Sequence, residues 1–339
     1  MPALWQRRSA SDWAFRQRSV TCAGLQWVIS ASPRQRGLMS FKSGFVSIIG
    51  RPNVGKSSLL NALLDTKISI VSPVPQTTRY KIRGIMHLPD AQAVFVDTPG
   101  MHALKEELAC RLNDVARSAI PDTELLLYVT DVTRRVGKEE EDIMRLVLES
   151  GIPAVMVFNK IDRGSRFLSD YTAAWKFQLK GSRASHDPIR YYIPVSATTG
   201  KNLGKLRQAV VELLPEHPPF YETQTLTDFP LKFRIADSIR EKLFLSLKEE
   251  LPHSVAVVIE EIEDLRRFSR IKATVYVNTE SQKGIVIGKG GALLKEIGTA
   301  ARKDLERMLG KKVFLELRVS VLKGWQEKPR ILAELGYTL

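Results

Sequence analysis

The sequence predicts an α/β domain with a doubly wound, mainly parallel sheet, followed by a small α+β domain. Its 339 residues suit two domains of ordinary size. Short apolar runs alternate with amphipathic stretches up to Leu214, as expected for parallel strands covered by helices. After a proline-rich stretch the order changes to a helix, two strands, a second helix and a last strand. Hydrophobic residues make up 44% of the chain and charged residues 26%, which is ordinary globular usage.

The first domain is expected to span 41–214. Its strands are predicted where short apolar runs occur, at 45–49, 93–96, 125–129, 154–158 and 192–195. Helices are predicted from Lys56 onward, at 108–119 and at 139–148. Ligands bind beyond the carboxyl ends of the strands in such sheets. Motifs that directly follow these runs are therefore candidates for a ligand site.

The second domain is expected to span 231–339, after a linker at 215–230. Pro215, Pro218 and Pro219 cannot lie inside a helix, which places the linker there. An amphipathic helix follows, whose apolar residues recur every four positions: Ile235, Ile239, Leu243 and Leu247. Strands are then predicted at 254–259, 271–277 and 313–321, and a helix at 292–309.

Residues 1–40 differ from the rest, since they hold six Arg, one acidic residue and three of the five Trp. This composition resembles a mitochondrial transit peptide. Alternatively, Met39 is the true start of the chain. A disordered segment is expected in both cases. The remaining positive charge is diffuse, with 21 basic and 16 acidic side chains in 228–339, so that the net charge of +14 does not by itself predict a nucleic-acid partner.

The chain has two cysteines, Cys22 and Cys110, without the paired spacing of a zinc site or a disulfide framework. We therefore expect a reducing compartment. No apolar run approaches 18 residues, so the sequence predicts no transmembrane helix.

A phosphate-binding loop is predicted between the first strand and the first helix. The run Gly50, Arg51, Pro52, Asn53, Val54, Gly55, Lys56, Ser57 matches the pattern Gly-x-x-x-x-Gly-Lys-Ser, and Ser58 follows it. Backbone N–H groups and a helix N-terminus would face the phosphates. Lys56 would reach the outer two phosphates, and the Ser57 hydroxyl would bind Mg²⁺.

A second motif follows the run at 93–96 and consists of Asp97, Thr98, Pro99 and Gly100. The Asp97 carboxylate is predicted to hold Mg²⁺ through water. The Gly100 N–H would lie near the terminal phosphate. Taken alone, these four residues are a common turn, but after a phosphate-binding loop they indicate a switch element.

Two further motifs indicate guanine rather than adenine. Asn159, Lys160, Ile161 and Asp162 follow the run at 154–158, and the Asp162 carboxylate can accept hydrogen bonds from N1–H and the 2-amino group of guanine. Adenine lacks the 2-amino group, so a buried carboxylate would be left poorly paired. Ser196 and Ala197 follow the next predicted strand, where a backbone N–H would meet the guanine oxygen.

In this order the four motifs resemble those of the Ras-like GTPase superfamily. Resemblance implies a switch segment at Gln76–Arg79, in which Thr77 or Thr78 completes the Mg²⁺ shell, with Thr78 favoured. The predicted catalytic residues are thus Lys56, Thr78 and Gly100. Met101 occupies the position where many members carry a water-orienting Gln, so slow turnover is expected. In relatives with a hydrophobic residue there, K⁺ supplies part of the charge stabilisation, and Asn53 is the residue implied to hold it.

The segment from Val286 to Ile297 resembles a KH domain, an RNA-binding module with a Gly-x-x-Gly loop. The predicted RNA-binding residues are Ile287, Gly288, Lys289, Gly290, Gly291 and Lys295. In such a loop a sugar-phosphate backbone lies against main-chain N–H groups, and Lys289 adds charge. The order of strands around the loop resembles the type II arrangement.

The chain resembles the Era family over about residues 41–339. The resemblance rests on the first motif and on runs that begin at Thr227, Ile239, Leu251, Ser281 and Leu335. It is weakest at 163–190, where no site is predicted. It implies a GTPase, expected as a monomer, that acts in maturation of the small ribosomal subunit and binds its RNA near the 3′ end. It also implies a cytoplasmic location with peripheral association to the inner membrane; a transit peptide would instead imply the mitochondrial matrix.

Three functions remain open from the sequence. The first is a GTPase switch that controls RNA binding. The second is an RNA-binding protein whose nucleotide domain does not hydrolyse GTP, which Met101 leaves possible. The third is a GTPase whose KH domain docks a protein, which the mild charge of 228–339 leaves possible.

Overall fold

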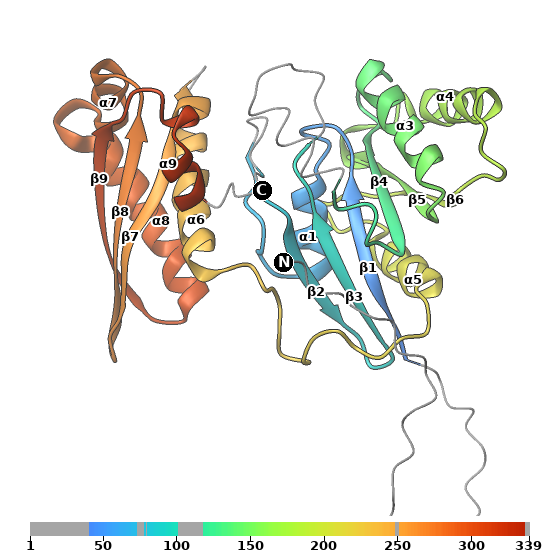
Figure 1. The fold of residues 1–339 in the computed structure, drawn as a ribbon, viewed down its shortest axis with the longest axis horizontal. Coiled ribbons are helices and arrows are strands. Elements are labelled where there is room, and N and C mark those ends of the chain that lie inside the picture. The colour runs from blue at the N-terminus through green and yellow to red at the C-terminus, as the bar shows by residue number, and fades with distance from the viewer. Residues whose placement is uncertain (1–40, 73–77, 79, 101–117, 248–250, 336–339) are drawn as a thin grey trace, which may run out of the picture. The chain divides into compact units, whose positions relative to one another are not determined.

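The computed structural model describes residues 41–72, 78, 80–100, 118–247 and 251–335 (Figure 1). Two sheets organise these residues, one of six strands and one of three. The extension at 1–40 and most of the helix predicted at 108–119 lie outside the described residues. Across the described part of the chain, no helix combines the length and the apolar character needed to cross a membrane.

The first sheet has the strand order β2-β3-β1-β4-β5-β6. Its strands are β1 (Lys42–Ile49), β2 (Ile82–His87), β3 (Ala91–Asp97), β4 (Leu125–Asp131), β5 (Ala154–Asn159) and β6 (Ile189–Pro194). All neighbours pair in parallel except β2, which pairs antiparallel with β3. The predicted mainly parallel sheet is confirmed, and β2 is a strand that the apolar pattern did not indicate.

Helices cover both faces of this sheet (Figure 1). On one face lie α1 (Lys56–Leu64) and α5 (Leu203–Leu213), whose Leu60 and Val210 pack in one cluster with β1, β3 and β4. On the other face lie α3 (Lys138–Ser150) and α4 (Leu168–Gly181), which contribute Met144 and Trp175 to a second cluster. Strands β3, β4 and β5 are buried along their whole length because helices enclose the sheet from both sides.

The second sheet has the order β7-β8-β9, with β7 antiparallel and β9 parallel to β8. Its elements are α6 (Leu231–Ser246), β7 (Ala256–Asp264), β8 (Phe268–Val277), α7 (Glu280–Ile287), α8 (Ala292–Leu309), β9 (Lys312–Val321) and α9 (Pro329–Glu334). The core joins Ile239 of α6 and Leu305 of α8 to the strands. Trp325, which is fully buried, packs with α9 residues against β7. The predicted α+β arrangement is confirmed.

The segment between α5 and α6 follows the β2 edge of the six-stranded sheet. The Ile85 N–H donates to the Leu226 carbonyl at 2.9 Å, and His87 Nε2 lies 2.8 Å from the Thr225 carbonyl. The Gln92 side chain accepts hydrogen bonds from the N–H groups of Phe220 and Tyr221. The first of these bonds satisfies a backbone N–H that an edge strand otherwise leaves unpaired, and the other bonds fix the segment to the sheet through side chains.

Candidate functional site

The phosphate-binding loop connects β1 to α1 and closes tightly over the end of β5. Gly55 has φ 97°, and a Cβ built there would lie 2.4 Å from Asn159 Nδ2. Only glycine meets both conditions, which explains its place in the motif. Asn53 also has a positive φ of 61°, so its side chain projects from a tight turn in the loop.

Lys56 is buried at the start of α1 and points into the loop. Its ammonium donates to the carbonyls of Gly50 at 2.9 Å and Arg51 at 3.0 Å. Burial lowers the pKa of Lys56 to about 8, although the negative charges of Asp97 and Glu140 oppose the shift. The ammonium is therefore held in place, in an environment where a phosphate would stabilise its charged form.

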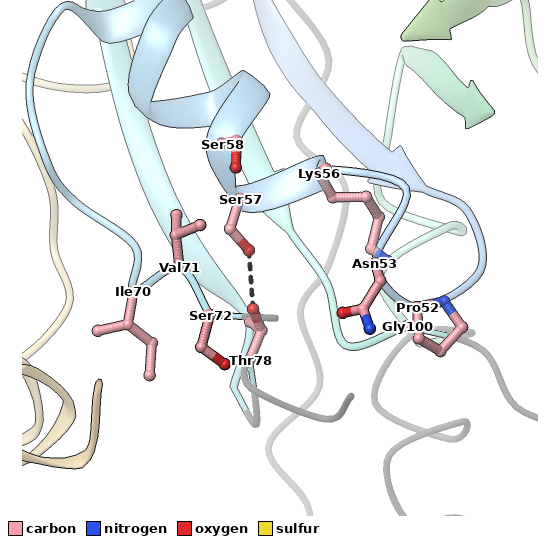
Figure 2. A pocket seen from close by; sticks show the side chains of 11 residues that line it. Pro52, Asn53, Lys56, Ser57, Ser58, Ile70, Val71, Ser72, Thr78 and Gly100 are labelled. Carbon is pink, nitrogen blue, oxygen red and sulfur yellow. Dashed lines mark hydrogen bonds between the residues drawn. The ribbon is translucent and has the colours of Figure 1, made fainter. Parts of the chain in front are cut away.

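Three predicted Mg²⁺ ligands come together beside this loop, and Figure 2 shows two of them, Ser57 and Thr78. Ser57 Oγ donates to Asp97 Oδ2 at 2.6 Å and lies 2.8 Å from Thr78 Oγ1. Asp97 Oδ1 is buried and has no hydrogen-bond partner among the described residues. Burial raises the pKa of Asp97, opposed by the hydrogen bond from Ser57 and the charge of Lys56. One carboxylate and two hydroxyls form the oxygen donor set that Mg²⁺ prefers, and the orphaned oxygen fits such an ion.

Ser69 also donates to Asp97 Oδ2, at 2.9 Å. Ser69 was not predicted from the sequence, because no motif marks a residue whose contact depends on how the chain returns after α1. Thr77, the alternative to Thr78, and Met101 lie outside the described residues. The choice between the two threonines and the role of Met101 stay predictions.

The Asp97 to Gly100 motif lies against the phosphate-binding loop. Thr98 Oγ1 donates to the Ile48 carbonyl at 2.8 Å, which fixes the motif to the end of β1. A Cβ at Gly100 would lie 2.7 Å from Pro52 Cα. Gly100 thus lines the same pocket as Lys56 and Ser57 (Figure 2), and its place near the terminal phosphate stays a prediction.

Asn159 and Lys160 tie the predicted guanine-binding segment to the phosphate-binding loop. Asn159 Nδ2 donates to the Val54 carbonyl at 2.8 Å, and its Oδ1 accepts from the Ala197 N–H at 3.1 Å. Lys160 Nζ donates to the Asn53 carbonyl at 2.5 Å and to Asp131 Oδ2 at 2.7 Å. One residue pair therefore joins three loops at the carboxyl edge of the sheet.

The remaining base-binding residues lie on the same edge. Asp162 belongs to a short 3-10 turn, Ile161–Arg163, and the Arg163 guanidinium lies 4.0 Å from its carboxylate. Ser196 is fully buried, and its Oγ accepts from the Thr199 N–H at 3.0 Å. Asp131, which positions Lys160, was missed from sequence. The sequence feature that could have indicated Asp131 is its place two residues after the apolar run at 125–129.

The Gly-x-x-Gly loop connects α7 to α8. Gly288 has φ 74°, and a Cβ there would lie 2.7 Å from Leu293 Cβ, so that a side chain would collide with the first turn of α8. Lys289 and Gly290 are exposed, and Gly291 caps α8 in a left-handed conformation. The backbone N–H groups at the start of this 18-residue helix thus lie beside an open loop.

A groove runs from this loop between α8 and β9. Its lining residues are Gly291, Leu294, Lys295, Gly298, Thr299, Arg302, Phe314, Leu315 and Leu317. Lys295 and Arg302 are two turns apart on α8 and supply positive charge to one wall. Phe314 is 54% exposed, with the Arg270 guanidinium 5.7 Å from its ring centroid. Of these, only Gly291 and Lys295 were predicted; Arg302 and Phe314 join them only when β9 pairs beside α8.

Comparison with known proteins identifies both domains. Residues 45–160 match the family model described as 50S ribosome-binding GTPase, and residues 250–326 match the KH domain model. The chain is 44% identical over 299 residues to GTPase Era of Geotalea daltonii, covering 88% of this chain and 98% of the relative. It is 41% identical over 302 residues to GTPase Era of Carboxydothermus hydrogenoformans, covering 88% and 99%. The chain belongs to the Era family of GTPases.

Solved Era structures agree with this assignment. The fold matches Era in complex with MgGDPNP and nucleotides 1506–1542 of 16S ribosomal RNA, with a TM-score of 0.81 and 36% identity over 88% of this chain and all of that one. A single-residue variant of Aquifex aeolicus Era bound to GDP and AlF4⁻ matches with a TM-score of 0.79, at the same identity and coverage. Membership of the Era family confirms the GTPase activity that the four motifs predicted.

Proposed function

We propose that this Era-family GTPase is a switch that binds small-subunit ribosomal RNA near its 3′ end through its KH domain and assists assembly of that subunit. One observation carries the proposal: the chain resembles, over 88% of its length, an Era protein solved with MgGDPNP and a 16S RNA fragment. The Gly-x-x-Gly loop and the groove beside it offer what single-stranded RNA requires. The loop presents backbone N–H groups to phosphates, and the groove combines charge with an exposed aromatic ring.

We propose Mg²⁺ as the metal of the nucleotide site, held by Ser57, Thr78 and Asp97. When bound, the ion would neutralise charge on the outer phosphates. The chain's own residues orient the nucleotide. Lys56 places a positive charge within the loop, and Gly100 brings a backbone N–H to the same pocket. Asp162 would accept hydrogen bonds from guanine.

Hydrolysis in this site would proceed without a glutamine after Gly100, because Met101 cannot polarise water. We propose that K⁺ supplies part of the missing charge stabilisation and that Asn53 contributes to its site. Support comes from the position of Asn53, whose side chain lines the pocket beside Lys56 and Gly100 (Figure 2).

A second candidate partner is the large ribosomal subunit, which the description of the matching GTPase model names. That model covers only residues 45–160, whereas the proposed RNA contacts lie in the KH domain. The Era complex contains small-subunit RNA and resembles both domains of this chain. These two points favour the small subunit.

The proposal is tested by changing the Gly-x-x-Gly loop. Gly288→Asp with Gly291→Asp adds negative charge where a phosphate must approach, so RNA binding should be lost while GTP affinity stays unchanged. Gly137→Asp with Gly181→Asp is a control of equal charge, since both glycines are exposed, neither has a positive φ, and a Cβ at either meets nothing within 4 Å.

Binding would be titrated with 3′ fragments of small-subunit RNA, and with large-subunit RNA, at two salt concentrations. Binding of phosphates should weaken as salt rises, because bound counterions are released. Equal RNA binding by the parent and the loop variant would refute the KH site. Salt-resistant binding of a protein, without RNA binding, would favour a protein-docking domain. A preference for large-subunit RNA would favour the second candidate.

We further propose a monomer in the bacterial cytoplasm that associates peripherally with the inner membrane, as the family resemblance implies. The alternative location is the mitochondrial matrix, if residues 1–38 are a transit peptide. Co-sedimentation with vesicles of anionic lipid and light scattering of the purified protein would test membrane association and oligomeric state. Fusing residues 1–38 to a fluorescent protein and observing whether the fusion enters mitochondria would decide between the two locations.

A further inference from the structure

A buried polar network ties the phosphate-binding loop to α3 and α4. Arg51 Nε lies 2.8 Å from Glu140 Oε1, with side chains 11% and 2% exposed. Tyr171 donates its hydroxyl to the same Glu140 oxygen at 3.0 Å, and lies 3.4 Å from Arg51. Tyr171 is fully buried and comes from 163–190, where the sequence resembles the Era family least.

This network also reaches Lys160, the other side chain that holds the phosphate-binding loop. The Tyr171 hydroxyl lies 3.2 Å from the carbonyl of Asp131, whose carboxylate binds Lys160. Lys160 in turn donates to the Asn53 carbonyl. Because a hydroxyl carries one proton, Tyr171 shares it between Glu140 and Asp131. The Tyr171 side chain of α4 thus contacts both residues that support the loop: Glu140, which holds Arg51, and Asp131, which holds Lys160.

The network acts on Lys56, whose ammonium would face the phosphates. Glu140 holds the guanidinium of Arg51. The backbone carbonyl of Arg51 accepts a hydrogen bond from Lys56 Nζ at 3.0 Å. Burial raises the pKa of Glu140, opposed by the Arg51 charge and the Tyr171 hydrogen bond. Removing one partner of a buried charge pair leaves the other uncompensated, so each member depends on the rest.

We propose that Glu140 and Tyr171 are positioning residues for nucleotide binding, which hold Arg51 so that the loop keeps its phosphate-binding shape and retains the nucleotide. This role goes beyond the proposed RNA function and does not depend on it. A loosened loop would release GDP faster, because the backbone and the Lys56 ammonium would spend less time in the bound geometry.

The test uses two Tyr→Phe variants that each remove one buried hydroxyl. Tyr171→Phe removes the contact with Glu140. Tyr128→Phe is the matched control, since Tyr128 packs in the same cluster and its hydroxyl has no hydrogen-bond partner among the described residues. Release of a fluorescent GDP analogue should be about tenfold faster in Tyr171→Phe, at the low end of what losing a hydrogen bond to a charged group causes. Tyr128→Phe should match the parent.

A double-mutant cycle separates positioning from a general structural effect. If Tyr171 acts mainly through Arg51, Tyr171→Phe should accelerate release clearly less in an Arg51→Ala background than in the parent. Glu140→Gln should also accelerate release, and keeps the proposal testable should Tyr171→Phe fail to fold. Equal release from Tyr171→Phe and Tyr128→Phe, or independent effects of Tyr171→Phe and Arg51→Ala, would overturn the proposal.

Discussion

The buried ammonium of Lys56 predicts that GTP binding weakens as pH rises above 8. Burial lowers the pKa of Lys56 from 10.5 to about 8 in the nucleotide-free protein. GTP phosphates would favour the charged form, so the pKa should rise on binding and the protein should take up a proton. GTP affinity should therefore fall as pH rises. Below pH 8 the Lys56 ammonium is already present, whereas above pH 8 Lys56 must take up a proton when GTP binds.

The magnitude follows from the fraction of Lys56 that is charged. With a pKa of about 8, the dissociation constant should rise about fourfold between pH 7 and pH 8.5. Proton uptake per GTP should increase from about 0.1 to about 0.8 over the same range. Isothermal titration calorimetry in buffers of different ionisation enthalpy measures this uptake.

Lys56→Arg is the matched control, since a guanidinium stays protonated throughout this range. Its proton uptake should not increase between pH 7 and pH 8.5. A parent protein whose uptake does not change between pH 7 and pH 8.5 would refute the account of Lys56 as a buried, partly titrated group.

Three further predictions concern the nucleotide site. Asp162→Asn should weaken GTP and admit xanthosine triphosphate, because an amide can donate to the extra oxygen that a carboxylate repels; direct binding measurements with both nucleotides check this, and an unchanged preference for GTP would exclude Asp162 as the base reader. Replacing Na⁺ by K⁺ at equal ionic strength should raise turnover, and Asn53→Ala should abolish the difference; equal rates of the parent in both salts would remove K⁺ from the mechanism. Asn159→Ala should lower the free energy of unfolding by about 1 to 3 kcal/mol, since the Ala197 N–H would lose its partner, with urea unfolding as the assay and a parent-like midpoint as the contrary result.

Motifs whose chemistry depends on local spacing were predictable from the sequence. Gly55 and Lys56 must be adjacent to form the loop, and the distance from Gly288 to Gly291 sets the KH turn. Strand order brought the four nucleotide-site motifs together, because loops that follow parallel strands meet at one edge of the sheet.

Contacts between distant parts of the chain were not predictable. Arg51 meets Glu140, and Glu140 meets Tyr171, only after α3 and α4 pack on the same face of the sheet. The buried stripe of α4 contains Tyr171 and Trp175, but Phe177 on its exposed side blurs the helical pattern.

Among the elements that were not predicted from the sequence, β2 and α7 were missed for local reasons. The strand β2 carries an exposed Arg83 and pairs antiparallel at the sheet edge, so it lacks a continuous apolar run. The helix α7 buries only Val286 and ends in three apolar β-branched residues, a composition that does not indicate a helix. Its one local signal is Thr279, whose side chain caps the helix by accepting from the Gln282 N–H at 3.2 Å.

The central claim, a GTPase linked to RNA binding by the KH domain, is tested most directly by GTP turnover with and without a 3′ fragment of small-subunit RNA. The rate would be measured with Mg²⁺ and K⁺ for the parent and for Gly288→Asp with Gly291→Asp. We predict that RNA raises the turnover of the parent, whereas the variant keeps the basal rate and does not respond. A parent rate that RNA leaves unchanged, or an equal increase in both proteins, would contradict the account.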